Sequence, residues 1–459
     1  MERSFSVSMD GGIDDSSKFD DDGRPKRTGT VLTTSAHIIT AVIGSGVLSL
    51  AWATAQLGWI AGPVALLAFS VITWFNSLLL ADCYRAPDGS RNYTYMDAVR
   101  AHLGGMKVLL CGLAQYSNLF GVTIGYAITA SISMVAIKRS NCFHKHGHDA
   151  GCHESNNPFI IMFGIMQIIL CQIPNFHKLS FLSVIAAVMS FAYSFIGLGL
   201  SIAKIAKDGA HPNTSLTGTV IGKDMSATDK MWNTFSALGD IAFAYAFSTD
   251  TLKSHPPENK SMKKATFTGI TVSTIFYTLC GLIGYAAFGN KAPGNFLTGF
   301  GFYEPFWLVD LANVCIVVHL VGAYQISLNP NGKAQFDNVF AGVLSTNIWI
   351  CRGLEQKEMA TKLVWRTAYV VFTTILAMLF PFFNDFVGLL GAASFWPLTV
   401  YFPIQMYIAQ AKIPKYSFTW IWLKILSFVC LIISLLAAAG SVQGLIKSLQ
   451  KFHPFKSES

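Results

Sequence analysis

Residues 41–53 read AVIGSGVLSLAWA and place a Gly-Ser-Gly triplet, Gly44 to Gly46, inside an otherwise apolar run. Glycine and serine are weak helix formers, so the triplet weakens a helix that its neighbours favour. Within a bilayer, no water satisfies the backbone groups of a broken helix. Two interpretations follow. Either the small residues let another helix pack closely, or the helix is interrupted and its free N–H and C=O groups hold a ligand.

The chain around this stretch has the composition of a membrane protein. Its 459 residues are 52% hydrophobic and only 13% charged, whereas soluble domains carry about 25% charged residues. Apolar runs of about 20 residues, the length that crosses a bilayer, recur along the chain. The sequence therefore predicts an all-α integral membrane protein with about 11 transmembrane helices. These spans are expected at 31–55, 60–83, 106–137, 158–173, 179–204, 232–249, 265–288, 305–327, 365–386, 388–409 and 420–446.

The charge distribution predicts how the chain is oriented. Residues 1–30 are polar and acidic and are expected to form a disordered cytoplasmic tail without a signal peptide. Residues 31–446 form the transmembrane domain, and residues 447–459 a short extracellular tail. With this orientation, Lys and Arg are roughly twice as numerous inside as outside. The net charge of +8 is attributed to basic loops, because no nucleic-acid motif is visible.

The predicted outside loops contain two candidate modification sites. Cys142 and Cys152 share one short loop, and an extracellular disulfide between them is expected. Free thiols, or a zinc or copper site formed with histidines of the loop, remain alternatives. Asn213 begins an Asn-Thr-Ser sequon in another outside loop and is expected to be glycosylated. The histidines of the alternative metal site are His144, His146, His148 and His153.

A second interruption is predicted in the sixth span, where Gly239 and Asp240 lie in the middle of WNTFSALGDIAFAYAFS. A carboxylate inside a membrane helix is costly and indicates a functional site. Spans 1 and 6 begin the two halves of a five-plus-five arrangement. Interrupted helices at matching places point to a transporter built from an inverted repeat, with the eleventh span as an addition.

Several long motifs carry a resemblance to a known family. The chain contains AVIGSGVLSLAWATAQLGW, AQYSNLFGVTIGYAITASISM, GDIAFAYAFS, SMKKATFTG and PFFNDFVGLLGAASFWPLTVYFPIQMYI, in this order. It resembles the plant amino acid permeases of the amino acid/auxin permease family from about Gly29 to Lys456. The resemblance implies a LeuT-type fold of the plasma membrane that takes up a broad range of amino acids with protons. Neutral substrates are expected, and acidic ones remain open.

The resemblance also implies where the amino acid binds. Residues Val42 to Val47 would line the unwound part of the first helix, with backbone N–H groups binding the substrate carboxylate. Asn118 and Tyr126 lie on one face of the third span, because their spacing of eight residues is close to two helical turns. The alternative for both is hydrogen bonding between helices. The substrate-binding candidates are Ile43, Gly44, Ser45, Gly46, Asn118, Tyr126, Phe243 and Tyr245.

Proton coupling requires a group that titrates between the two compartments. His37 precedes the first interruption by two turns, and His319 lies deep in the eighth span. Histidine titrates near pH 6.5, between an acidic exterior and a neutral cytosol. A neutral histidine bonded to a carbonyl is the alternative, and Asp240 and Asp310 are rival candidates. No cofactor other than the co-substrate proton is expected, and no resident metal.

The chain departs from the family pattern in two places. The sixth span passes from Thr249 directly to Asp250, roughly six residues short of the family's helix. Residues 326–365 are foreign to the family, and an Asn-Pro-Asn-Gly turn predicts that the eighth helix stops near Leu328. A non-transporting isoform or amino acid sensor, or an auxin-type carrier, is therefore the alternative. Enzymatic activity is not expected, because no P-loop, catalytic triad or HExxH pattern occurs. The oligomeric state is left open.

Overall fold

The computed structural model describes residues 30–147, 150–152, 154–172, 180–211, 213–246, 258–300, 305–328 and 355–451. Across these ranges the chain is helical, with two isolated β-bridges and no strand. Each of the eleven predicted spans coincides with helical structure. The α-helices are α1 (Val31–Val42), α2 (Leu50–Asp82), α3 (Tyr95–His102), α4 (Met106–His146), α5 (Asn157–Cys171), α6 (Ser180–Asp208), α7 (Ala227–Ala244), α8 (Glu258–Phe288), α9 (Phe306–Leu328), α11 (Glu355–Leu379), α12 (Phe383–Ser394), α13 (Phe402–Gln410) and α14 (Phe418–Lys451).

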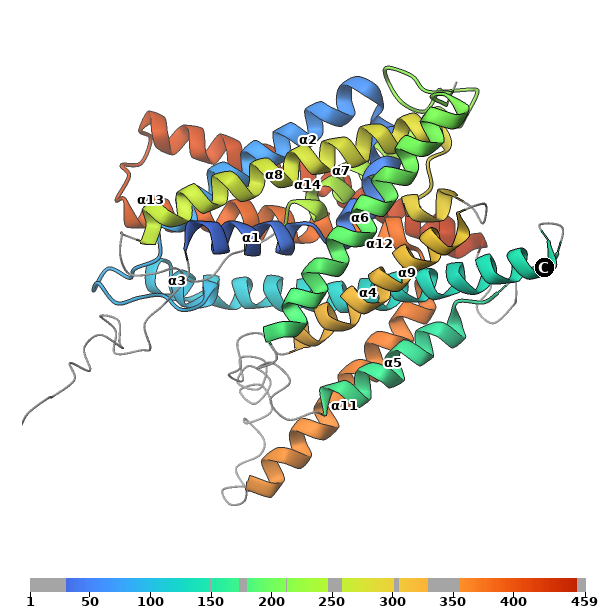
Figure 1. The fold of residues 1–459 in the computed structure, drawn as a ribbon. Coiled ribbons are helices and arrows are strands. Elements are labelled where there is room, and N and C mark those ends of the chain that lie inside the picture. Colours follow the sequence, from blue (N-terminus) through green and yellow to red (C-terminus); the bar gives the residue numbers. More distant parts are fainter. Residues whose placement is uncertain are drawn as a thin grey trace, which may run out of the picture.

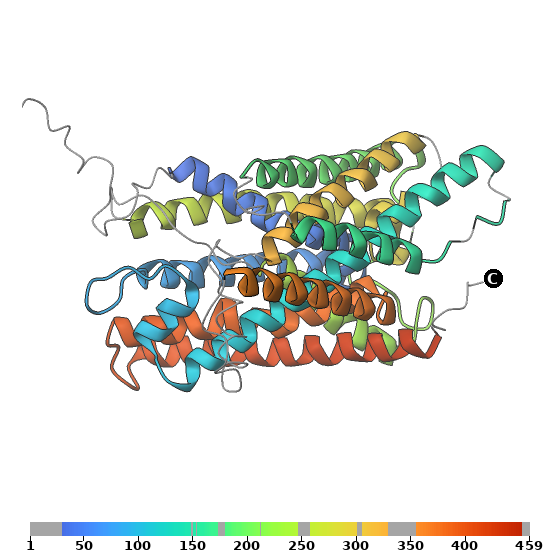
Figure 2. The same cartoon turned by 90° about the horizontal axis from the view of Figure 1, so that it is seen from below.

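Among the described residues, seven helices are long and apolar enough to cross a membrane, judged by length and composition. Their outward faces are lined by exposed large hydrophobic side chains, as expected of surfaces that meet lipid. The helices lie in a bundle in which α2 runs beside α8, and α6 beside α9 (Figure 1). The pair α5 and α11 pack together in both views (Figures 1 and 2). The fold is therefore an all-α membrane bundle.

The first predicted span is interrupted in the structure. Thr30 caps the start of α1 through a capping box with Thr33, and α1 ends at Val42. A short 3-10 helix, η2 (Ser45–Ser49), then leads into α2. The long α2 also holds a sharp kink at Gly58, where φ is 84° and ψ is −176°. The kink lies between the first predicted span, which ends at residue 55, and the second, which begins at residue 60.

Four helix boundaries can be compared with the sequence-based expectation. The α4 helix continues to His146, so Cys142 lies in its last turns and not in the loop that was predicted to begin at residue 138. The α7 helix begins at Ala227, because the Ser226 side chain caps it by accepting from the Asp229 N–H at 3.1 Å. It stops at Ala244, five residues before the predicted end. The α9 helix is described as far as Leu328, and the residues on which its predicted stop depends lie outside the described ones.

The two departures from the family pattern fall largely outside the described residues. The segment after the sixth span lies within 247–257, and most of the foreign block lies within 329–354. The predicted cytoplasmic tail likewise lies outside them, apart from Thr30. At the other end, α14 continues to Lys451, beyond the predicted limit of residue 446.

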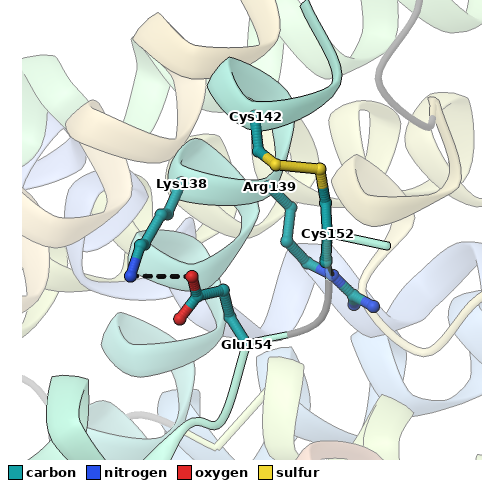
Figure 3. The surroundings of a disulfide bond; sticks show 5 residues. All are labelled: Lys138, Arg139, Cys142, Cys152 and Glu154. Carbon is teal, nitrogen blue, oxygen red and sulfur yellow. Dashed lines mark hydrogen bonds and ion pairs between the residues drawn. A yellow bond between two sulfur atoms is a disulfide. The ribbon is translucent and has the colours of Figure 1, made fainter. Parts of the chain in front are cut away.

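The C-terminal end of α4 carries the predicted disulfide. The structure contains a bond between Cys142 and Cys152, with an S–S distance of 1.98 Å (Figure 3). Two further contacts hold the segment after α4 against the helix: Lys138 pairs with Glu154 at 2.7 Å, and Arg139 Nε donates to the Cys152 carbonyl at 3.0 Å. The other cysteines among the described residues are free and buried. They are Cys83, Cys111, Cys171, Cys280, Cys315 and Cys430.

The loop between α6 and α7 closes over the kink at Gly58. The Thr219 N–H donates to the Ala55 carbonyl at 3.0 Å, and the Trp59 N–H donates to the Ser215 carbonyl at 3.3 Å. These bonds satisfy backbone groups that the kink removes from the helical ladder. They are possible because Gly58 meets Gly218 without side chains between them: a Cβ on Gly58 would lie 2.2 Å from the Gly218 nitrogen. The loop thus fixes the end of the first span.

Asp224 organises the same loop and gives a pH prediction. Its carboxylate accepts from the Val220 N–H and the Asn290 side chain, both at 2.7 Å. These hydrogen bonds, with nearby Lys223 and Lys291, hold the pKa of Asp224 below its ordinary value. A lowered pKa in the folded state stabilises the protein above the unfolded pKa of about 3.9, and this stabilisation is lost as pH falls through the folded pKa.

We therefore expect Asp224→Ala to lower the thermal unfolding midpoint by a constant amount between about pH 5 and pH 8. The difference from the native chain should vanish only below about pH 4. Unfolding of purified protein across this pH range measures it. Asp208→Ala is the control, because Asp208 pairs with Lys204 in an exposed i, i+4 bridge that contributes little. A difference that grew toward acid pH would contradict the assignment.

Candidate functional site

The ends of two interrupted helices meet in the middle of the bundle. The α1 helix stops at Val42 and the α7 helix at Ala244. Gly46 lies directly against the end of α7, since a Cβ on Gly46 would be 3.0 Å from the Ala244 Cα. The sequence predicted the first interruption at Gly44 to Gly46, and the structure confirms it. The second was predicted at Gly239 and Asp240 and is wrong in position, because α7 runs unbroken through both residues and ends at Ala244. The structure brings the two helix ends into contact, as expected when both helices belong to one binding site.

The first interruption presents free backbone N–H groups. Ser45 and Gly46 form the first turn of η2, so their N–H groups have no carbonyl within that helix to bond. Gly44 supplies no side-chain cap, and its carbonyl accepts from the Val47 N–H at 3.2 Å. Ile43 is fully buried. N–H groups at a helix start, with the positive end of the helix dipole, suit an anionic group such as a carboxylate.

The carbonyl ends of the interruptions converge on one side chain that the sequence did not indicate. Tyr277 of α8 is fully buried, and its hydroxyl contacts the Val42 carbonyl and, at 3.3 Å, the Ala244 carbonyl. The Tyr277 hydroxyl thus lies against the last carbonyl of each helix, and the Val42 carbonyl also accepts from the Gly44 N–H at 2.8 Å. Its ring packs edge-on against Tyr245 at 5.4 Å between centroids. Tyr277 therefore ties the end of α1 to the end of α7.

Removing this hydroxyl gives a direct prediction. In Tyr277→Phe the ring still fills its space, but the Ala244 carbonyl loses its donor, whereas the Val42 carbonyl keeps the Gly44 N–H at 2.8 Å. A buried polar group without a partner costs about 1–3 kcal/mol, and we expect the unfolding midpoint of the purified protein to fall accordingly. Tyr324→Phe is the matched control, because Tyr324 is equally buried and its hydroxyl pairs with a Thr373 hydroxyl, which can rotate to another acceptor. Equal losses in both variants would contradict a special role for Tyr277.

His319 reaches the first interruption from α9. The side chain is 7% exposed, and Nδ1 lies 2.7 Å from the Ala186 carbonyl of α6. A carbonyl only accepts, so Nδ1 is the donor and Nε2 of a neutral ring is free to accept a proton. Nε2 lies 3.9 Å from the position that a Cβ on Gly44 would take. The structure thus fits both interpretations of His319: it is bonded to a carbonyl and it faces the break.

The other two candidates for proton coupling lie elsewhere. His37 is exposed on α1, and its backbone carbonyl accepts from the Thr40 hydroxyl. Asp240 is fully buried in α7, one turn before Ala244. His319 is therefore the only one of the three that the structure places directly against Gly44.

The residues predicted to line the substrate pocket lie on α4 and at the end of α7. Phe243 lies beside Gly46, with a ring carbon 3.4 Å from the Cβ position of that glycine. Tyr245 is fully buried and donates to Thr274 at 3.2 Å, so its hydroxyl faces α8. On α4, Tyr126 interacts with the Ser327 side chain of α9, and Asn118 is half-buried. Their roles toward a ligand stay predictions.

An interrupted first span whose free backbone groups meet the end of α7, inside a bundle of apolar helices, is typical of a membrane transporter. The same fold is seen in a solved structure of Mhp1, described as a nucleobase-cation-symport-1 family transporter in a closed conformation with bromovinylhydantoin bound. The TM-score is 0.53 at 12% identity, over 93% of this chain and 95% of that one. This likeness shows the fold alone, which is of the LeuT type.

Comparison of sequences gives the family. The model of the transmembrane amino acid transporter proteins matches residues 27–447. Amino acid permease 6 of Arabidopsis thaliana is 64% identical, over 97% of this chain and 96% of its own length. Amino acid permease 1 of the same plant is 60% identical, over 97% and 95%. The chain belongs to the transmembrane amino acid transporter family and, within it, to the plant amino acid permeases. Amino acid transport across a membrane is thus the activity of its relatives.

Proposed function

We propose that this protein is a proton-coupled symporter that carries amino acids into the cell across the plasma membrane. The observation that carries the proposal is the meeting of Gly46 with Ala244, where free N–H groups of η2 lie beside the end of α7. Every amino acid shares a carboxylate, so recognition by main chain suits a broad substrate range. Neutral amino acids are the expected substrates, with acidic ones as the open alternative.

The choice of a proton as the coupling ion rests on Tyr277 and His319. In transporters of this construction, freed carbonyls coordinate the coupling cation. Here the Tyr277 hydroxyl already bonds the Val42 and Ala244 carbonyls, so this pair is not free for a metal ion. His319 supplies a titrating nitrogen that faces Gly44. Protonation there would change the charge beside the substrate carboxylate and so link the two binding events.

The orientation follows from the charge distribution. We place the N-terminus in the cytoplasm and the C-terminus outside, since Lys and Arg favour the cytoplasmic face. The disulfide and Asn213 then lie on the outer side, where thiols oxidise and glycans are attached. Asn213 is half-exposed, and only its side-chain oxygen is engaged, by Lys223 at 3.1 Å. In contrast, Asn92 and Asn259 donate their amide nitrogens within the protein.

The first experiment is substrate-evoked current in oocytes, after surface expression of the protein is confirmed. Neutral, acidic and basic amino acids are applied at external pH of about 5.5 and 7.5, on either side of the histidine pKa. A saturable inward current that is larger at acid pH supports proton-coupled uptake. Saturable binding without current, in protein that reaches the surface, would overturn the proposal and favour the non-cycling sensor suggested by the two departures in sequence. Current evoked by auxin alone would favour the auxin-type carrier.

A further inference from the structure

Asp240 lies where α7 meets α12 and α14, away from the free N–H groups of the break. The side chain is fully buried, and neither carboxylate oxygen has a hydrogen-bond partner among the residues that the structure describes. Oδ1 points at α12 and lies 3.1 Å from the position that a Cβ on Gly388 would take. An ionised carboxylate in such a place would carry a large desolvation cost, whereas a protonated one carries little.

A second carboxyl group lies on α12, near the point where Asp240 meets that helix. Asp385 is one turn before Gly388, the residue that Oδ1 of Asp240 approaches. Asp385 Oδ2 accepts from the Ser448 hydroxyl of α14 at 3.0 Å. Asp240 is fully buried and Asp385 is half-buried, so the burial of Asp240 and a negative charge on Asp385 both favour the protonated form of Asp240. One of the two is therefore expected to carry a proton.

The packing of the three helices leaves room for a proton but not for a larger cation. A methyl group on Gly444 would lie 2.0 Å from Asp385 Oδ1. One on Gly388 would lie 2.6 Å from the Ser441 hydroxyl oxygen, and one on Gly391 would lie 2.1 Å from the Gly239 carbonyl. At each of these three glycines the helices lie too close together for a methyl group, and so for a hydrated metal ion. A proton needs no additional space, since it binds one existing oxygen.

We propose that Asp240 and Asp385 hold one proton between them at the junction of α7, α12 and α14, as a proton-binding site separate from the substrate break. Release of this proton would leave two negative charges in the junction, and its return moves no other atom into the site. The α14 helix, which lies outside the five-plus-five arrangement, contributes Ser448 to it. The junction is thus a second site at which the protein exchanges a proton.

The junction is connected to the break by a single helical turn. Asp240 and Ala244 are four residues apart on α7, and Ala244 contacts Gly46. Between them, the Phe243 nitrogen lies 2.5 Å from the Cβ position of Gly391 on α12. A change in charge at Asp240 would alter how α7 packs on α12, and the last turn of α7 would carry this change to the break.

The charged groups around the junction leave Asp240 uncompensated in the described part of the chain. Lys447 of α14 pairs with Asp229 at the start of α7, at 2.8 Å. Lys230 donates to loop carbonyls, including that of Thr217 at 2.6 Å. On the α2 side the neighbour of α7 is Gln56, an uncharged amide that accepts from Asn233. The carboxyl of Asp385 is therefore the ionisable group that remains near Asp240.

Infrared difference spectroscopy of the purified full-length protein tests the site without transport. We expect the native chain at neutral pH, in sodium-free buffer, to show the carbonyl stretch of a protonated carboxylic acid in a buried site. This band should disappear in Asp240→Asn and shift in Ser448→Ala, which removes the donor to Asp385. Asp229→Asn is the matched control on the same helix and should keep the band, because Asp229 is paired with Lys447. Identical spectra for the native chain, Asp240→Asn and Ser448→Ala would overturn the proposal.

A transport measurement then tests whether the site contributes to the pH dependence of uptake. This second experiment rests on the proposed symport. Asp240→Asn mimics the protonated carboxyl, so we expect uptake that is the same at acid and neutral external pH. If the native chain gives no substrate-evoked current while the infrared band is present, the proposed function fails and the proton site stands. If the native chain transports and Asp240→Asn keeps the native pH dependence, the link between the junction and the break is wrong.

Discussion

Replacing His319 by glutamine is expected to remove the stimulation of amino acid uptake by acid pH. Glutamine can still donate to the Ala186 carbonyl, which His319 Nδ1 contacts at 2.7 Å, but it has no nitrogen that titrates near neutral pH. We expect acid-stimulated uptake to fall by about 5- to 150-fold, the range typical of a coupling free energy between two sites. Uptake of labelled substrate at two external pH values, normalised to surface protein, measures the change.

His211→Gln is the control for this substitution. His211 lies in the loop between α6 and α7, where Nδ1 accepts from the Asn213 N–H at 3.2 Å, far along the chain from the interrupted helices. We expect this variant to keep the native pH dependence. A His319→Gln variant that still responds to acid pH as the native chain does would show that the proton is carried elsewhere, with the Asp240 junction as the next candidate.

Replacing Gly58 by alanine is expected to prevent accumulation of folded protein. The backbone at Gly58, with φ of 84° and ψ of −176°, lies in a region that essentially only glycine adopts. The strain costs on the order of 1–3 kcal/mol. In addition, the new Cβ would lie 2.2 Å from the Gly218 nitrogen and 2.5 Å from the Leu216 carbonyl oxygen, so backbone has to move. Against a total stability of about 5–15 kcal/mol, the sum removes much of the folded state.

Gly222→Ala separates strain from contact in this prediction. Gly222 lies in the loop that closes over Gly58, has a φ of 83°, and would meet nothing within 4 Å if it gained a Cβ. It therefore reports the cost of the backbone conformation alone. Monodisperse protein recovered after detergent extraction, compared by fluorescence-detected size exclusion, is the measurement. Equal recovery of Gly58→Ala and Gly222→Ala would show that the contact with the loop is not what holds the kink.

The interruption at Gly44 to Gly46 could be predicted because it depends on neighbouring residues alone: three weak helix formers lie together inside an apolar run. The spans were predictable because the bilayer fixes both their length and their composition. Hydropathy alone, however, did not locate the start of α7 at Ala227, which depends on a capping serine in a polar segment.

Tyr277 and Asp385 were missed for a different reason. Tyr277 lies in TIFYTLCGLIGY, where an aromatic residue in an apolar helix is unremarkable, and its role depends on two helix ends that are distant in sequence. Asp385 follows a polar asparagine near a span boundary and so looks like a residue at the membrane surface. The close approach of Gly444 brings it under α14. Both roles are set by packing between helices, which spacing along one chain does not encode.

The burial of the free cysteines has a practical consequence for following the transport cycle. All six that the structure describes as free are buried, and Cys142 and Cys152 are consumed by their bond. Apart from Cys351, which lies outside the described residues, a maleimide probe therefore meets little native background. A single reporter cysteine can be introduced at an exposed position such as Ser90 without first removing the native cysteines. Fluorescent labelling for single-molecule distance measurements is then open to the otherwise unaltered chain, provided that reductant is left out.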